Sequence, residues 1–335
     1  SGAGSSGSRP LRAPYPTGVE TLTTQTQTGP DPKTALSSRG GGPRADRAFQ
    51  ALTLGAGLLV LAVLALILIT TTREAWPAFS EMGLSFITEN RWDPPSEIYG
   101  GLAFIYGTAI VSLIALIFAV PVSLGIALFL TELAPRRLRA PAVTVIDLLA
   151  AVPSVVFGLW GVLVVAPKLV PIYRWFHDVL GGIPVIGSVF GEPVGSGRNF
   201  MTAGLILAIM ITPIITSIAR EVFSTVPRAD KDAALALGAT RWEMIKGAVF
   251  PHSFGGIVGA VILGLGRAMG ETIAIALIIG SSTQITANVF ASGNAMPAVI
   301  VSQIGESTGT FTAALIGLGV VLFVMTVIIN TVAQY

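Results

Sequence analysis

Long stretches without any charged residue dominate the chain. They cover residues 48–72, 98–131, 148–167, 199–219, 247–266, 272–305 and 307–335. A helix of about 20 apolar residues is long enough to cross a hydrocarbon core about 30 Å thick. The short alternating segments of a transmembrane barrel are absent from the sequence, so the pattern predicts an all-α, polytopic membrane protein.

We expect six membrane spans, at roughly 48–70, 101–131, 141–166, 200–219, 253–282 and 309–331. The second is longer than one straight crossing needs, and Pro121 predicts a kink or an extension beyond the bilayer. Asp147 and Pro153 make the third an irregular helix. A seventh span over 283–305 is the main alternative. Because polar residues, glycine and proline interrupt that stretch, we interpret it as a partly helical external loop.

Composition and charge agree with this interpretation. The chain is 52% hydrophobic and 11% charged, with a mean hydropathy of +0.77, values that soluble domains do not show. Lysine and arginine gather in the N-terminal tail and in the loops after spans two and four, so we place these parts and both termini in the cytoplasm. Topology accounts for the basic residues, and no nucleic-acid partner is expected. Cysteine is absent, which excludes disulfides and cysteine metal sites.

The domain organisation follows from the same pattern. Residues 1–47 are rich in Gly, Ser, Thr, Pro and Gln, and we expect a disordered cytoplasmic tail. Residues 48–335 form the transmembrane domain. No signal peptide is expected ahead of the first span, since a charged-then-apolar start is missing.

A charged segment lies between the fourth and fifth spans, in a cytoplasmic loop at 220–252. It reads KDAALALGATRWEMIKGAVFP over residues 231–251. Asp230 is expected to cap a short helix over 231–237, and Gly238 suits the left-handed residue that ends such a helix.

A second short helix is expected directly afterwards. Thr240 would begin it, Glu243 would complete a capping box, and Pro251 would stop it just before span five. An isolated helix pair of this kind is compatible with DNA binding, but the flanking spans hold it at the membrane surface. An amphipathic connecting loop is the other alternative.

The spacing of Asp232, Ala233, Ala234, Gly238 and Pro251 resembles the EAA loop of ATP-binding-cassette importer permeases. That resemblance implies a coupling helix that docks in a groove of a separate ATPase subunit. The implied coupling residues are Asp232, Ala233, Ala234, Gly238, Ala239, Thr240, Arg241, Trp242, Glu243 and Pro251. The sequence departs from the family pattern in having Asp232 for glutamate, and Ala248 and Phe250 for the common Ile and Leu.

No phosphate-binding loop of the Walker A type is present, because none of the lysines follows a glycine. The chain is therefore expected to bind no cofactor itself. If the resemblance holds, ATP and magnesium belong to the partner ATPase subunit.

A second informative stretch is LGRAMGETIAI, residues 265–275. Arg267 lies about 21 Å into the expected fifth span, and Glu271 would follow one turn later on the same face. Each charge costs roughly 2.5–3.5 kcal/mol to insert, so such residues face a bundle interior and are functional candidates. A self-neutralised structural ion pair is the alternative. Gly266 and Gly270 would allow a neighbouring helix or ligand to approach closely.

RAMGET, REVFSTVPRADKDAALALGATRW and VPSVVFGL together resemble the permeases of phosphate-specific transport (Pst) systems, most closely their PstC subunits. The resemblance covers roughly residues 50–335. It implies the type I ABC importer permease fold in a bacterial cytoplasmic membrane. The implied partners are a homologous PstA-like permease, two PstB-like ATPase subunits, an external PstS-like phosphate-binding protein and the lipid bilayer.

The chemistry of the implied pathway suits these residues. An arginine fork matches two phosphate oxygens, and Glu271 could hold Arg267 when phosphate is absent. Hydroxyl groups of Thr272, Ser154, Thr108 and Ser112 are further candidates for the pathway, although such groups in helices often bond their own backbone.

Other functions remain as alternatives. The chain could serve an importer of another oxyanion or small solute, or it could be a secondary transporter, which would not need an EAA loop. His177 and His252 are the histidines of the chain, and they lie in separate loops in the expected topology. No catalytic or metal-binding set is therefore expected, and we do not expect an enzyme.

Overall fold

The computed structural model describes residues 43–333, and most of them are helical. The chain divides into two units, residues 1–63 and 64–335, which are described separately. Helix α2, Pro43–Met82, begins in the first unit and ends in the second. Its residues 46–63 are exposed throughout.

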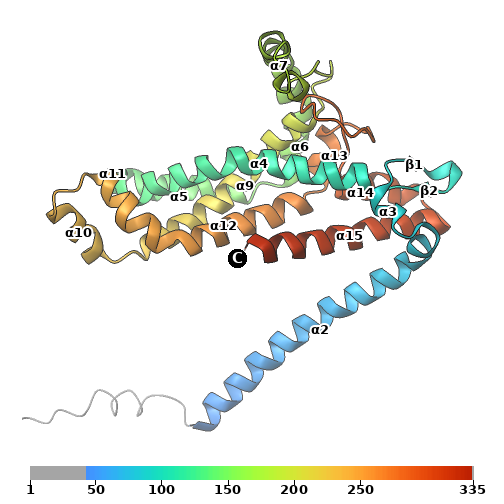
Figure 1. The fold of residues 1–335 in the computed structure, drawn as a ribbon. Coiled ribbons are helices and arrows are strands. Elements are labelled where there is room, and N and C mark those ends of the chain that lie inside the picture. The colour runs from blue at the N-terminus through green and yellow to red at the C-terminus, as the bar shows by residue number, and fades with distance from the viewer. Residues whose placement is uncertain (1–42, 334–335) are drawn as a thin grey trace, which may run out of the picture. The chain divides into compact units, whose positions relative to one another are not determined.

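The second unit is built around three long helices that lie side by side in Figure 1. These are α4 (Leu102–Leu128), α9 (Phe200–Ser224) and α12 (Phe250–Gly270). Helix α9 is the most buried of the apolar helices, because α4, α12 and several shorter helices pack around it. Small residues allow this close packing. A Cβ at Gly204 of α9, for example, would lie 2.4 Å from Ile114 Cγ2 of α4.

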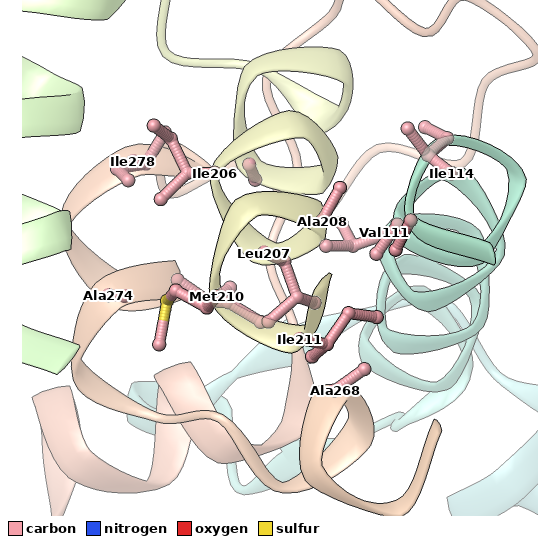
Figure 2. Close-up of a cluster of buried hydrophobic side chains, with 14 of the residues drawn as sticks. Val111, Ile114, Ile206, Leu207, Ala208, Met210, Ile211, Ala268, Ala274 and Ile278 are labelled. Carbon is pink, nitrogen blue, oxygen red and sulfur yellow. The ribbon is translucent and has the colours of Figure 1, made fainter. Parts of the chain in front are cut away.

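The central hydrophobic core joins α9 to its neighbours. Figure 2 shows Leu207 and Ile211 of α9 near Val111 of α4 and Ala268 of α12. A second cluster of buried residues lies where α4 begins, and a third lies where α4 ends. The two ends of the bundle therefore have separate cores.

One end carries a short hairpin. Its strands are β1 (Trp92–Asp93) and β2 (Ile98–Tyr99), paired antiparallel around the 3₁₀ turn η1 (Pro94–Ser96). Trp92 lies within 5.4 Å of the Tyr99 ring and 5.0 Å of the Phe104 ring, measured between ring centroids. The neighbouring elements at this end are α3 (Ser85–Thr88), α14 (Met296–Gln303), η5 (Ile304–Glu306) and α15 (Gly309–Ala333).

The other end carries short helices between α9 and α12. These are α10 (Arg228–Ala236), α11 (Arg241–Met244) and the π-helical turn η4 (Ile245–Val249). A similar π turn, η2 (Phe129–Leu133), ends α4. The remaining elements are α5 (Arg136–Ala150), α6 (Ser154–Trp160), the π turn η3 (Gly161–Val165), α7 (Ala166–Leu180), α8 (Ile186–Val189) and α13 (Ile273–Ile278).

Within residues 43–333, six helices are long and apolar enough to cross a membrane. They run over 46–82, 102–133, 154–180, 200–224, 241–270 and 309–333. The prediction of an all-α protein with six apolar helices is therefore confirmed. Helix α4 continues through Pro121, and the stretch 283–305 is indeed only partly helical.

The bounds of two expected spans were wrong. The third, 141–166, falls on two helices separated at 151–153, because Pro153 has no backbone N–H with which to continue α5. The fifth, 253–282, ends at Gly270. Residues 43–47, assigned to the tail, are the start of α2, and the rest of that tail lies outside the described residues.

Candidate functional site

The intramembrane charged stretch is interrupted. Helix α12 ends at Gly270, Glu271 has an extended backbone with φ −70° and ψ 125°, and α13 starts at Ile273. Residues 267 and 271 therefore do not share a helical face, and the expected pairing one turn apart was wrong. Among the described residues, ion pairs join Arg91 to Asp93 and Lys231 to Glu132, and none joins Arg267 to Glu271.

Glu271 is buried, with 7% of its surface exposed. Its Oε1 accepts a 3.5 Å hydrogen bond from the Ala274 backbone N–H at the start of α13. A carboxylate in this position compensates one of the free N–H groups that every helix start leaves. The structure thus places Glu271 as a cap of the restarted helix.

Arg267 is exposed in the last turn of α12. Its depth follows from its neighbours: Ala268 packs in the same core as Ile211, near the middle of α9 (Figure 2). A Cβ at Gly264 would lie 2.7 Å from Ile215 Cδ1, which fixes the same level of α9. Arg267 is therefore at the centre of the bundle's length and directed away from this chain's own core.

The two glycines beside Arg267 do not pack within the chain. No atom of the described residues lies within 4 Å of a Cβ built at Gly266 or Gly270, apart from the helix itself. The predicted close approach of a helix at these glycines is therefore not made within residues 64–333, and the space beside them is open to a neighbour.

Helix α13 packs against α6, the helix that restarts after Pro153. The contact is close, since a Cβ at Gly158 would lie 3.0 Å from the Ala274 Cα atom. Ser154 and Thr272 stand at the starts of these two packed helices. These two predicted hydroxyl residues are far apart in sequence, but the elements that carry them pack together. The Thr272 hydroxyl donates to the Gly270 carbonyl at 3.1 Å.

Thr108 and Ser112 are both buried in α4, but their hydroxyl groups differ. The Thr108 Oγ1 donates to the Phe104 carbonyl at 2.8 Å and accepts from the Met296 backbone N–H at 2.9 Å. Thr108 therefore ties α4 to the start of α14. The Ser112 hydroxyl has no hydrogen-bond partner among the described residues. Of these two candidates, only Ser112 has a hydroxyl that is free for another group.

The charged segment forms two helices around a glycine corner, as expected. Gly238 has φ +87°, a left-handed conformation that glycine adopts readily. The Thr240 side chain accepts from the Glu243 backbone N–H, and the Glu243 carboxylate accepts from the Thr240 backbone N–H. The predicted glycine corner and capping box are confirmed.

Two details of that segment were wrong. Helix α10 begins at Arg228 after Pro227, so Asp230 lies inside its first turn rather than at the cap. Pro251 does not end the second helix, because the helix runs from Arg241 through η4 into α12. Proline near the start of α12 is tolerated there because the π turn before it changes the hydrogen-bonding pattern.

The outer surface of this segment is exposed and partly apolar. Leu237 is 90% exposed and Trp242 is 55% exposed, with Lys246 Nζ 5.0 Å from the Trp242 ring centroid. Asp232, Ala233 and Arg241 are also exposed, whereas Ala234 and Ala239 are half-buried. Underneath, Met244 and Ile245 are buried in the third core cluster. The segment therefore exposes one face and packs the other on the bundle.

Sequence reasoning missed Glu132, which forms an ion pair with Lys231. Glu132 lies in the π turn η2 at the end of α4, 99 residues before its partner. No local spacing signals such a contact. The two histidines do not contribute to a site: His177 Nδ1 shares a hydrogen bond with the Phe190 carbonyl, and His252 is exposed.

Comparison with known proteins identifies the family to which the chain belongs. Residues 119–335 match the family model described as binding-protein-dependent transport system inner membrane component. The chain is 43% identical over 293 residues to the phosphate transport system permease protein PstC of Mesorhizobium japonicum, covering 87% of this chain and 89% of that protein. The PstC of Haemophilus influenzae is 45% identical over 274 residues, covering 81% and 86%.

Solved structures share the fold at low sequence identity. A subunit of an alginate ABC transporter, solved with a periplasmic protein bound to an alginate pentasaccharide, has a TM-score of 0.53 and 18% identity over 86% of this chain and 94% of its own. The methionine transporter MetNI in an inward-facing conformation has a TM-score of 0.52 and 13% identity, over 73% and 96%. These likenesses establish the ABC importer permease fold.

Proposed function

Because the chain belongs to the family of binding-protein-dependent transport system inner membrane components, and within it to the PstC permeases, we propose that it is the membrane-spanning permease subunit of an ATP-driven importer of inorganic phosphate. The observation that carries the proposal is the 43% identity to a PstC protein over 87% of this chain. The chain is a transport subunit, and hydrolysis of ATP with magnesium belongs to partner subunits in the proposal.

The proposed complex contains a PstA-like permease beside this chain, two PstB-like ATPase subunits beneath it, and a PstS-like protein that delivers phosphate. It lies in a bacterial cytoplasmic membrane, with both termini and the α10–α11 segment on the cytoplasmic side. The exposed Leu237 and Trp242 supply apolar area for an ATPase subunit, with exposed charges around them. ATP binding would draw the coupling segments of the two permeases together and open the pathway outward.

Arg267 is the proposed contact for phosphate in the pathway. A guanidinium in the middle of a bilayer costs roughly 2.5–3.5 kcal/mol to insert, so it needs a polar surrounding. Its exposure, and the open space at Gly266 and Gly270, support a location between this chain and the second permease. The planar fork of arginine fits two oxygens of a phosphate dianion. Ser112, Ser154 and Thr272 remain candidates to line the same path.

The test is phosphate uptake into vesicles that contain the complete reconstituted complex. We expect uptake that requires ATP and the binding protein, and that sulfate and molybdate do not inhibit. Uptake of another oxyanion in place of phosphate would contradict the proposed substrate while leaving the importer function in place. Uptake driven by an ion gradient without the ATPase subunits would point to a secondary transporter.

A further inference from the structure

The coupling helix α10 has little apolar packing of its own. None of its residues is fully buried, and only Ala234 packs, half-buried, against the core cluster beneath it. The chain holds α10 at both ends, through residues 225–227 to α9 and through the Gly238 corner to α11. A helix held this way can rotate unless a further contact fixes it.

Lys231 provides such a contact. Its Nζ atom lies 2.5 Å from Oε1 of Glu132, and the two side chains are 17% and 11% exposed. The other ion pair in residues 43–333, between Arg91 and Asp93, is local and far more exposed, at 61% and 31%. Exposed pairs contribute little, whereas removing one partner of a shielded pair leaves an unmatched charge. The Lys231–Glu132 pair is therefore a strong constraint on α10.

Glu132 is placed by the way α4 ends. The last five residues of that helix form the π turn η2, which ends at Leu133 ahead of the extended Ala134. A π turn shifts the side chains that follow it around the helix axis, and such turns are frequent at functional sites. Glu132 belongs to the same continuous helix as Thr108, which ties α4 to α14, and as Ser112. The ion pair thus links α10 directly to α4.

Further charges line the same small cavity. It has a volume of about 220 Å³ and is lined by Glu132, Lys231, Asp232, Arg241 and apolar residues of α10, α11 and η4. Asp232 can therefore compete for Lys231, and Arg241 can compete for Glu132, when the helices move. Charged neighbours of both signs make an exchange of partners possible without leaving a charge unpaired.

From this geometry we infer that the Lys231–Glu132 pair transmits movement of α10 to α4, so that both are positioning residues for coupling between ATP hydrolysis and transport. The inference rests on the proposed function. Without the pair, movement of α10 reaches the bundle only through its chain connections to α9 and α11 and through the packing of its inner face, where Ala234 lies against the third core cluster. The complex then still assembles and hydrolyses ATP, but fewer solute molecules cross for each ATP consumed.

The test uses the complete complex with Glu132→Lys, Lys231→Glu and the double variant that exchanges the two charges. We expect each single variant to assemble and retain ATP hydrolysis while the ratio of transport to hydrolysis falls about tenfold or more. The exchanged pair should restore most of the ratio. Arg91→Glu and its exchanged pair with Asp93 are matched controls and should leave the ratio unchanged.

A cross-linking measurement separates this inference from the proposed function and from misfolding. The chain has no cysteine, so Glu132→Cys with Lys231→Cys can be linked by a short, reducible bifunctional thiol reagent without interference from other thiols of this chain. The two substitutions should lower the ratio of transport to hydrolysis. Linking the cysteines should restore part of it, because the link again joins α10 to α4, and reducing the link should lower it again. A ratio near wild type in both single variants, or no recovery in the exchanged pair, would overturn the inference. Failure of the wild-type complex to take up phosphate would contradict only the substrate.

Discussion

The corner at Gly238 and the break at Glu271 both interrupt helices, but by different means. At Gly238 the backbone turns through a positive φ, and the capping box of Thr240 and Glu243 restarts the helix at an exposed site. At Glu271 the backbone is extended, the side chain is buried, and the restarted helix α13 packs on α6 and α9. The first interruption is made by neighbouring residues in the sequence, and the second is held by distant parts of the chain.

This difference matters for transport. An interruption that is stabilised locally keeps its shape while its surroundings move. This property suits the proposed docking of the segment on an ATPase subunit. An interruption held by neighbouring helices changes when those helices move, which suits a pathway. Broken helices inside a bilayer are tolerated where protein or a water-filled cavity surrounds them.

The largest effect is expected at Arg267. Arg267→Gln removes the cation from an exposed position at mid-bundle depth without emptying a packed core, so assembly should remain. Phosphate uptake by the reconstituted complex should be abolished, because no guanidinium remains to meet the dianion. Arg174→Gln, at an exposed arginine of α7, is the matched control and should transport normally.

Arg267→Lys tests this prediction further. A role of the positive charge alone predicts that the lysine variant transports, whereas a contact that needs the planar guanidinium fork predicts that it does not. We expect no uptake. Uptake near the wild-type rate in Arg267→Gln would contradict a contact between Arg267 and phosphate.

An intermediate effect is expected at Gly238. A Cβ there meets no atom within 4 Å, so Gly238→Ala introduces only the strain of a positive φ, about 1–2 kcal/mol. Gly238→Val should disturb the corner further, because a β-branched residue is strongly disfavoured at positive φ, and should lower transport-coupled ATP hydrolysis several-fold with the spans still folded. Gly247→Ala, in the same segment at a negative φ and equally open, should have little effect. Equal hydrolysis by all three variants would mean that the corner does not matter for coupling.

The smallest expected effect is on stability, and it should differ between the two buried hydroxyl residues of α4, Thr108 and Ser112. Thr108→Val keeps the side-chain shape but leaves the buried Met296 N–H unpaired, which costs about 1–3 kcal/mol of the free energy of unfolding. Ser112→Ala breaks no hydrogen bond among the described residues and should change stability by about 0.5 kcal/mol or less. Thermal unfolding of the purified subunit in detergent measures both. Equal destabilisation would show that Ser112 also has a partner within the folded chain.

Features that depend on neighbouring residues could be predicted from the sequence. The apolar runs predicted six long apolar helices, since a helix satisfies its own backbone in a bilayer. The capping box at Thr240 and the glycine corner at Gly238 were predicted because their hydrogen bonds and backbone conformations involve residues at most a few positions apart.

Features that join distant residues depend on how the helices pack. Gly270 permits a helix to end and Thr272 permits one to start, but such local signals are weak inside an apolar run, and the apolar pattern predicted that the helix would continue to 282. The break exists because packing of α13 against α6 and α9 compensates the helix hydrogen bonds that are lost. Thr108 finds Met296 188 residues later, and Glu132 finds Lys231 99 residues later. Local sequence patterns do not predict such contacts, because the packing of distant helices determines which side chains meet.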